Sequence, residues 1–422
     1  MPNSIATNRN LQYKVWGISL FIIYPLFSLP FIFRGIIKRE KWAYLLASIF
    51  MGYMGILYPP AGDMYRYAQD FNLYKELDWN LFWIFMALRF DYFLPLLSFF
   101  LGKLGFHAEI TRFIFVACSY FMLFNLYHDI TFCNKELSKK KIRILALVIL
   151  VPLTFNGYLF RMGFAQITLM YGIYWLMIRH QSKGYLFIIL AAIIHWSFTP
   201  FILITIISKN KILNFSNRTF LVLCCLLIFA DAAPIGIYII QSLPIPESLF
   251  NHIDEYISGS QAGEIQFSIK QIVVNQFSNI ILYITLYAYY IYYKNNPQPL
   301  RLKLFTNSLM IIVILSSSIP ELYGRMIGLL KSFLVLSFIF YYKHSYYKLL
   351  RIVFLFIFIN ILFSFWQLRF YIRFGQYDQL LKSSSIGLIT FHYTDEWVTS
   401  NVDEDGILIK WLKLGYRPAE RE

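Results

Sequence analysis

Charged residues are scarce in this sequence. Only 14% of its 422 residues are Asp, Glu, Lys or Arg, whereas 58% are hydrophobic and 20% are aromatic. The mean hydropathy is +0.54. A soluble domain of this composition would expose large apolar patches to water. A bilayer would cover that surface, and several apolar runs reach the ~20 residues that a membrane-spanning helix needs. The composition therefore predicts a polytopic integral membrane protein.

Cysteine is also rare, and its four positions indicate no disulfide framework. Three cysteines lie in apolar runs and Cys133 lies in a basic loop. The first apolar run ends in Phe33-Arg34 rather than at a small-residue cleavage site, so we predict no cleavable signal peptide. The chain lacks a glycine-rich phosphate loop, a nucleophile elbow and a cysteine-histidine cluster. We accordingly predict neither a metal site nor a cofactor.

The formal net charge of +15 reflects where the basic residues lie. They gather in short loops between apolar runs, which is the distribution typical of cytoplasmic loops in membrane proteins. The strongest such signal is the loop 135–143, whereas the loops 61–80 and 241–268 have an acidic balance and are predicted to lie outside. The partners that this charge indicates are membrane lipids rather than nucleic acid.

These alternations predict an all-α protein with about 10–12 transmembrane helices. Residues 1–368 form the predicted transmembrane domain, and residues 369–422 form an outer tail with a short interfacial helix over Gly406–Leu414. The run Val15–Phe33 is predicted to be a single crossing, which places both termini outside.

Two apolar runs conflict with a simple count of crossings. The loop 61–80 is predicted to lie outside and the loop 135–143 inside, so an odd number of crossings must separate them. Phe113–Tyr127 supplies one crossing, and Leu81–Leu101 therefore cannot be a second plain span. Tyr185–Ile207 is flanked by basic loops on both sides and carries His195 at its middle. We predict one or two re-entrant or broken segments here, with the second broken at His195–Pro200. A plain span with a mildly basic outer loop is the alternative.

On this topology the isolated charges collect in the outer half of the membrane, where ionisable residues mark a functional site by default. Asp63, Arg66 and Tyr67 would share one face of a helix, with spacings of three and four residues. Further along, the charges are Arg161, Glu321, Arg325, Lys331, Arg369 and Arg373. The structural alternatives are a salt bridge for Glu321–Arg325, headgroup anchoring for Arg369–Arg373, and a hydrogen-bonded core histidine for His195. Arginines beside carboxylates suit an amphiphile with a diphosphate head.

Four short motifs occur in order along the chain: Gly62-Asp63-x3-Tyr67, Asn156-Gly157 before Arg161, His195-Trp196-Ser197, and Tyr323-Gly324-Arg325. In this order they resemble the EpsG-like branch of the Wzy-type polysaccharide polymerases, over roughly residues 40 to 345. One departure is that Tyr158-Leu159-Phe160 intervene before Arg161, where the family usually has Arg-Gln two residues after Asn-Gly.

The resemblance implies a bacterial inner-membrane glycosyltransferase, similar to the GT-C class, with its active site facing the periplasm. Such enzymes join undecaprenyl-diphosphate-linked oligosaccharide units into O-antigen, capsule or exopolysaccharide. A chain-length-regulating co-polymerase is a candidate partner. The alternatives are a flippase for lipid-linked oligosaccharides, and an O-antigen ligase or membrane acyltransferase. A flippase usually has repeated halves, and the sequence has no evident internal repeat.

Roles follow for the candidate residues. Asp63 is the predicted general base, ahead of His195 and Glu321. Arg66 would keep Asp63 ionised, because a cation within about 4–6 Å lowers a carboxyl pKa. The diphosphate is assigned to Arg161 and Arg325, and then to Lys331 and Arg369, with Tyr67 and Arg373 as further substrate contacts.

Overall fold

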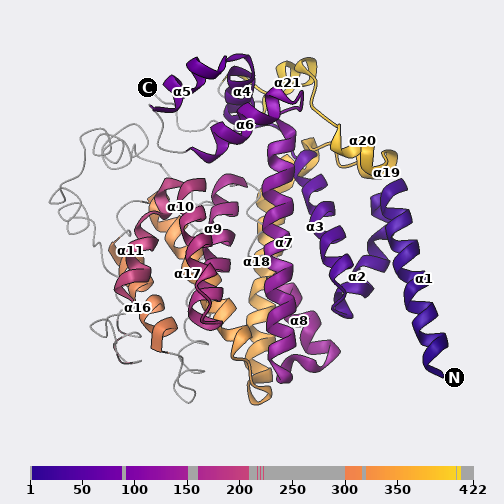
Figure 1. Ribbon diagram of the computed structural model, residues 1–422, viewed down its shortest axis with the longest axis vertical. Coiled ribbons are helices and arrows are strands. Elements are labelled where there is room, and N and C mark those ends of the chain that lie inside the picture. Colours follow the sequence, from indigo (N-terminus) through magenta and orange to yellow (C-terminus); the bar gives the residue numbers. More distant parts are fainter. Residues whose placement is uncertain are drawn as a thin grey trace. The chain divides into compact units, whose positions relative to one another are not determined.

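The computed structural model describes residues 2–87, 92–150, 160–208, 300–315, 320–404 and 406–409, together with three single residues between 216 and 222 (Figure 1). Every described element is helical, apart from one isolated antiparallel bridge between Val402 and Leu408. The chain forms two compact units. Unit 1 comprises residues 1–173, 182–199 and 361–416, and unit 2 comprises 174–181, 200–360 and 417–422.

Unit 1 begins with a helical hairpin, so the predicted single crossing Val15–Phe33 is wrong. Helix α1 (Pro2–Ile23) ends before a 3-10 turn at Pro25–Ser28, and α2 (Leu29–Ile37) returns beside it. The centroid of the Tyr13 ring lies 6.0 Å from that of the Phe31 ring, and the Arg34 guanidinium lies over the Tyr13 ring at 3.6 Å. Proline lacks a backbone N–H and its ring blocks the preceding turn, which explains the break. The N-terminus therefore lies on the same side of this hairpin as Arg34. Its outer placement stays a prediction.

The centre of unit 1 is the pair α3 (Lys41–Ile56) and α7 (Glu109–Cys133), which pack along their lengths. Gly52 permits this close approach, because a Cβ there would lie 2.7 Å from the Phe113 ring. Among the described residues, α7 is the one helix long and apolar enough to cross a membrane by length and composition, with a mean hydropathy of 1.4. A buried core helix of a soluble protein meets the same criterion.

Three short helices lie together at the Glu109 end of α7: α4 (Asp63–Glu76), α5 (Trp79–Ala87) and α6 (Phe93–Lys103) (Figure 1). They enclose an apolar cluster in which the Phe82 and Phe99 rings stack at 4.1 Å and Tyr74 packs edge-on against Phe82. Helices of 9 and 11 residues are too short to cross a bilayer. The run Leu81–Leu101 is interrupted at Tyr92, directly before α6, as its parity predicted, and Arg89 and Asp91 lie outside the described residues.

The remainder of unit 1 includes α8 (Lys140–Leu150), α9 (Phe160–Ile173) and α10 (Lys183–Ile194), with α9 packed on both α7 and α10. Helix α10 stops at His195, whose backbone is extended (φ −149°, ψ 114°), and a 3-10 turn follows at Trp196–Phe198. Helix α11 (Pro200–Ile207) begins at the proline. The predicted break at His195–Pro200 is confirmed. At the break, His195 caps the 3-10 turn by accepting from the Ser197 amide, and Pro200 occupies the first position of α11, where its missing N–H is tolerated.

Unit 2 contains α11, α16 (Leu300–Leu315), α17 (Pro320–Phe340) and the first part of α18 (Tyr347–Phe374). Helices α16 and α17 pack through Phe305 and Phe333, whose ring centroids are 5.0 Å apart. The predicted outer loop 241–268 lies outside the described residues, and so do the apolar runs on either side of it, apart from Thr219 and Val222.

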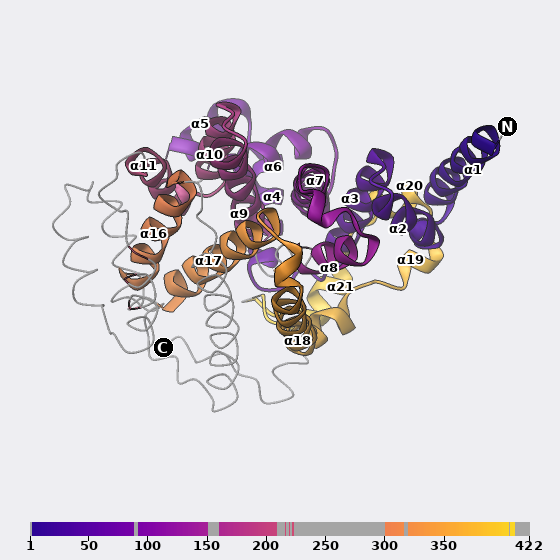
Figure 2. The ribbon, with the colours of Figure 1, turned by 90° about the horizontal axis from the view of Figure 1, so that it is seen from below.

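The segment after α18 folds back over unit 1. It contains α19 (Gln379–Lys382), α20 (Ser385–Ile389) and α21 (Asp395–Asn401). Figures 1 and 2 both show α19 and α20 beside the first helices of the chain, and Ser385 Oγ donates to the Phe21 carbonyl. The predicted domain boundary at residue 368 falls inside α18. Gly406–Leu408 forms a turn and a bridge rather than helix, and residues 410–414 lie outside the described residues.

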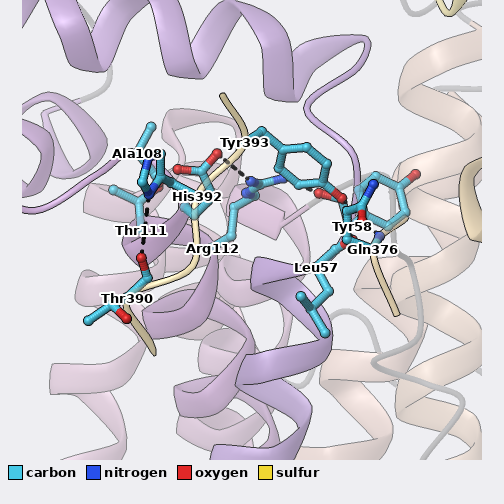
Figure 3. Close-up of polar contacts among 10 residues, drawn as sticks. Leu57, Tyr58, Ala108, Thr111, Arg112, Gln376, Thr390, His392 and Tyr393 are labelled. Atoms are coloured by element: carbon cyan, nitrogen blue, oxygen red, sulfur yellow. Dashed lines mark hydrogen bonds and ion pairs between the residues drawn. The ribbon is translucent and has the colours of Figure 1, made fainter. Parts of the chain in front are cut away.

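A buried arginine joins this C-terminal segment to the core of unit 1 (Figure 3). The Arg112 guanidinium forms an ion pair with Glu109 at 3.1 Å, and the two side chains are only 7% and 9% exposed. It also donates to the Tyr58 carbonyl and faces the Tyr393 ring. The Tyr393 hydroxyl in turn donates to the Leu57 carbonyl at 2.6 Å. One cation thereby ties the end of α3 and the start of α7 to the C-terminal segment.

Replacing Arg112 should loosen the C-terminal segment. Arg112→Ala leaves the Glu109 carboxylate buried without its cation, which typically costs about 3–5 kcal/mol of folding free energy. The matched control is Lys382→Ala, which breaks the exposed Lys382–Asp378 pair and should cost under ~1 kcal/mol. Detergent unfolding curves and limited proteolysis within residues 376–404 measure both effects. Equal curves and equal cleavage for the two variants would contradict the anchoring role of Arg112.

Candidate functional site

The candidate site is built on the loop that joins α3 to α4. Pro59 and Pro60 prevent α3 from continuing, and Gly62 turns the chain with φ +62° and ψ −133°, a conformation that favours glycine. Helix α4 then begins at Asp63, so its carboxylate lies at a helix N-terminus, where negative charge is stabilised. The local sequence thus fixes both the position and the favoured charge of Asp63.

Helix α4 places the first group of predicted site residues on one face. Arg66 forms an ion pair with Asp63, whose side chain is 43% exposed, while that of Arg66 is 59% exposed. Solvent weakens such a pair, so it orients the carboxylate more than it stabilises the fold. Tyr67 follows one turn after Asp63 and is half-buried. The predicted helical face of Asp63, Arg66 and Tyr67 is confirmed.

Arg161 joins this face from a distant part of the sequence. Its guanidinium carbon lies 5.3 Å from the centroid of the Tyr67 ring, within the range of a cation–π contact. The preceding residue, Phe160, is buried and packs edge-on against Tyr58 at 5.5 Å, which fixes the start of α9 against the α3–α4 loop. The structure therefore brings Asp63, Arg66, Tyr67 and Arg161 together, while Asn156 and Gly157 lie outside the described residues.

Arg373 lies at the same end of unit 1, near the end of α18. Two residues after the helix, the Gln376 amide donates to the Leu57 carbonyl at 3.1 Å, which ties this helix end to the loop that precedes Asp63. Arg373 is exposed, and Arg369 lies one helical turn before it. A basic pair at a helix C-terminus also complements the helix dipole.

His195 is buried, with 6% of its surface exposed, and it makes local hydrogen bonds. Its Nδ1 lies 3.0 Å from Ser197 Oγ and accepts from the Ser197 amide, which caps the 3-10 turn. The geometry favours a histidine that shapes the helix break over one exposed to a polar substrate.

The remaining candidates belong to unit 2. Glu321, Arg325 and Lys331 lie on α17, and the helix places Glu321 and Arg325 one turn apart on one face, as their spacing predicted. The structure describes the backbone of these residues and not their side chains. Among the described residues, no three His, Cys, Asp or Glu side chains come together to hold a metal.

The C-terminal segment also contributes to the site, which the sequence motifs did not predict. The Gly406 carbonyl accepts from the Gly62 amide at 2.6 Å, directly before Asp63. A tight turn presents this carbonyl, with hydrogen bonds between Asp403 and both Gly406 and Ile407. Gly406 itself has φ +82°, and a Cβ there would lie 3.1 Å from Tyr65. The signal available in the sequence was the Asp403-x-x-Gly406 turn pattern.

A second missed contact holds the same segment in place. The rings of His107 and His392 stack at 3.9 Å with an interplanar angle of 8°. Burial and the neighbouring His392 lower the pKa of His107, which favours its neutral form in the stack. Glu109 and Arg112, which open α7, were missed as well. The sequence feature that could have predicted this ion pair is a carboxylate and a guanidinium three residues apart at the start of an apolar run.

The Gly406–Gly62 hydrogen bond should control the opening of the loop before Asp63. Gly406→Ala adds a Cβ that meets Tyr65 and Gly62, so amide hydrogen exchange over residues 57–66 should accelerate. Gly105→Ala is the matched control, because Gly105 also has positive φ (+83°) but nothing within 4 Å of the added Cβ. Exchange of the same peptide in the control should match the parent protein. Unchanged exchange in Gly406→Ala would contradict the contact.

Comparison with known proteins adds one finding to this geometry. Residues 41–382 match the EpsG family, and this range contains all the predicted site residues. The C-terminal segment from residue 383 onward, which includes Tyr393 and Gly406, lies outside the match. No curated protein and no solved structure matches the chain. Because the match covers well over half of the sequence, the chain belongs to the EpsG family, which is linked to exopolysaccharide biosynthesis.

Proposed function

We propose that this protein is a membrane glycosyltransferase that joins undecaprenyl-diphosphate-linked oligosaccharide units into a bacterial surface polysaccharide. The observation that carries the proposal is the meeting of Asp63 and Arg66 with Arg161 across the Tyr67 ring. Family membership supports a role in polysaccharide synthesis. Insertion in the bacterial inner membrane is supported by α7, by the apolar composition and by the family. The acidic outer loops favour an active site on the periplasmic face.

The reaction follows from the chemistry of these groups. A hydroxyl of the incoming unit attacks C1 of the reducing-end sugar of the growing chain. A new C1–O glycosidic bond forms, the bond from C1 to the diphosphate oxygen breaks, and undecaprenyl diphosphate leaves. Asp63, half exposed at the start of α4, accepts the hydroxyl proton. Removal of the proton as the bond forms makes the hydroxyl a competent nucleophile.

The departing diphosphate requires cations. Arg161 is the first candidate, because its guanidinium is held by the Tyr67 ring beside the Asp63 face. Guanidinium groups bind phosphate oxygens through paired hydrogen bonds and stabilise the negative charge that develops on them. Arg373 and Arg369 would add positive charge from the end of α18. Arg325 and Lys331 of α17 are separate candidates for diphosphate binding, and Glu321 is an alternative acid–base group. His195 is assigned the role of a positioning residue at the helix break.

The test is incubation of the purified full-length protein with synthetic lipid-diphosphate repeat units. A ladder of products is expected for a polymerase. A single transfer would indicate a ligase, and no product, combined with movement of substrate across vesicles, would indicate a flippase. Sealed vesicles of opposite orientation in the same assay report which face carries the activity.

Removing the Asp63 carboxylate should abolish most of the ladder. General-base catalysis contributes typically about 10²–10⁴-fold, so Asp63→Asn should reduce kcat by a factor in this range. Binding of the lipid-linked substrate should be retained, because the arginines remain. Asp70→Asn on the same helix is the matched control, and His195→Gln should be milder than Asp63→Asn. Normal turnover by Asp63→Asn and no turnover by His195→Gln would exchange the two roles.

The fork geometry of Arg161 should matter beyond its charge. Arg161→Lys keeps the positive charge but loses the planar two-pronged contact, so kcat/KM should still fall, by about tenfold or more. Arg66→Lys serves as the control, because its exposed ion pair with Asp63 does not depend on a planar group. If Arg161→Lys retains full activity, Arg161 serves to pack α9 on α4 and does not bind diphosphate.

A further inference from the structure

A second group of basic residues meets at the end of unit 1 opposite the Asp63 site. It lies where the α2–α3 turn, the last turns of α7 and the start of α8 converge (Figure 1). Arg143 of α8 donates from Nη1 to the Ile37 carbonyl at 2.9 Å, two residues before Arg39. Tyr127 of α7 donates from its hydroxyl to the Arg143 carbonyl at 3.3 Å. Tyr44 of α3 packs edge-on against Tyr127 at 6.3 Å.

Four buried polar atoms in this cluster have no hydrogen-bond partner within the described part of the chain. They are Arg39 Nε, Tyr44 Oη, His128 Nδ1 and Arg143 Nε. Tyr44 is 1% exposed, and the His128 ring packs against it at 5.5 Å. Buried polar atoms are almost always satisfied, so such a group calls for a ligand, an ion or ordered water. Three of the four are donors, whereas one water oxygen accepts only two hydrogen bonds.

The charges around these atoms favour an anion. Burial and the nearby Arg143 cation lower the pKa of Arg39, and Lys41 adds further positive charge beside His128. The acidic groups at this end are Asp129, beside His128, Glu136 in the turn between α7 and α8, and Glu40, whose carboxylate accepts from the Trp42 indole. The basic residues outnumber them, and two guanidinium groups that repel each other are stabilised by a shared oxyanion.

The backbone of Arg39 provides independent support. Arg39 has φ +64°, and the bonds from its amide to Ile36 and from the Glu40 amide to Gly35 complete a Schellman turn at the end of α2. Glycine is the residue that this position favours, because other side chains are strained there. An arginine in the strained position indicates that its side chain has a role which glycine cannot supply.

We propose that Arg39, Arg143 and Tyr44 form a binding site for a phosphate oxyanion. The guanidinium groups supply charged donors from two elements, and the Tyr44 hydroxyl supplies a third from a buried position. The ligand is a phosphate group, carried either by an anionic phospholipid or by a small phosphate in solution. Basic pockets between helices at the cytoplasmic membrane surface recognise lipid phosphates in this way. The site is separate from the Asp63 face and does not depend on the proposed polymerase reaction.

The variant that tests the site is Arg39→Gly, because glycine relieves the backbone strain and so should not impair folding. The full-length protein in phosphatidylcholine nanodiscs is titrated with phosphatidylglycerol in one arm and with inorganic phosphate in the other. Retained ligand is counted by native mass spectrometry, and the Tm is followed. The parent protein should bind in at least one arm, and Arg39→Gly should weaken that binding by about tenfold or more, as expected for the loss of charge-assisted hydrogen bonds.

Two control variants distinguish specific binding at this site from non-specific electrostatic attraction of anions to the basic surface. Lys141→Gln removes one exposed positive charge at the same end of unit 1. His180→Gly relieves the backbone strain at the other described non-glycine residue with positive φ, and it leaves the proposed site unchanged. Both should bind as the parent does. Binding in the lipid arm alone identifies a headgroup, and binding in the phosphate arm alone identifies a soluble anion. No binding in either arm, or equal loss in Arg39→Gly and Lys141→Gln, overturns the proposal.

Discussion

The buried Arg112 guanidinium is the constraint on which the candidate site depends. A cation this deeply buried is stable only where its partners are fixed around it, and here they come from separate parts of the chain. Glu109 belongs to its own helix, Tyr58 follows α3, and Tyr393 belongs to the C-terminal segment. The contacts of this one guanidinium therefore hold the loop that leads into Asp63 and bind the C-terminal segment to it.

The same end of unit 1 combines rigid supports with exposed chemical groups. Helices α3 and α7 are packed closely, and the α4–α6 cluster is closed by stacked aromatic rings. Asp63 and Arg66 stay substantially exposed on that support. The proposed glycosyl transfer needs this combination, because the reacting groups must be held in place and still be reached from water. The C-terminal segment adds a hydrogen bond to Gly62 from outside the family match.

Arginine has different surroundings at the two ends of unit 1. Near Asp63, Arg161 faces an aromatic ring and Arg66 faces a carboxylate. At the opposite end, Arg39 and Arg143 have orphaned donor atoms and the nearby charges are mainly basic. The first arrangement suits a group whose charge changes during a reaction, while the second suits a permanently charged ligand. If both proposed phosphate sites are correct, the protein acts on one phosphate-bearing amphiphile and binds another phosphate group at its opposite end.

Composition and hydrophobic periodicity determined the helical class, the interruption within Leu81–Leu101 and the break at His195–Pro200, because proline and charge act locally on a helix. Four short motifs also determined the family. The sequence could not reveal that Val15–Phe33 folds as a hairpin, since a run of that length satisfies a single crossing equally well. Nor could it reveal that Arg161 meets Tyr67, or that Gly406 binds Gly62. These contacts join residues far apart in the chain, and only the packing of α9 and the C-terminal segment on the α3–α4 loop decides them.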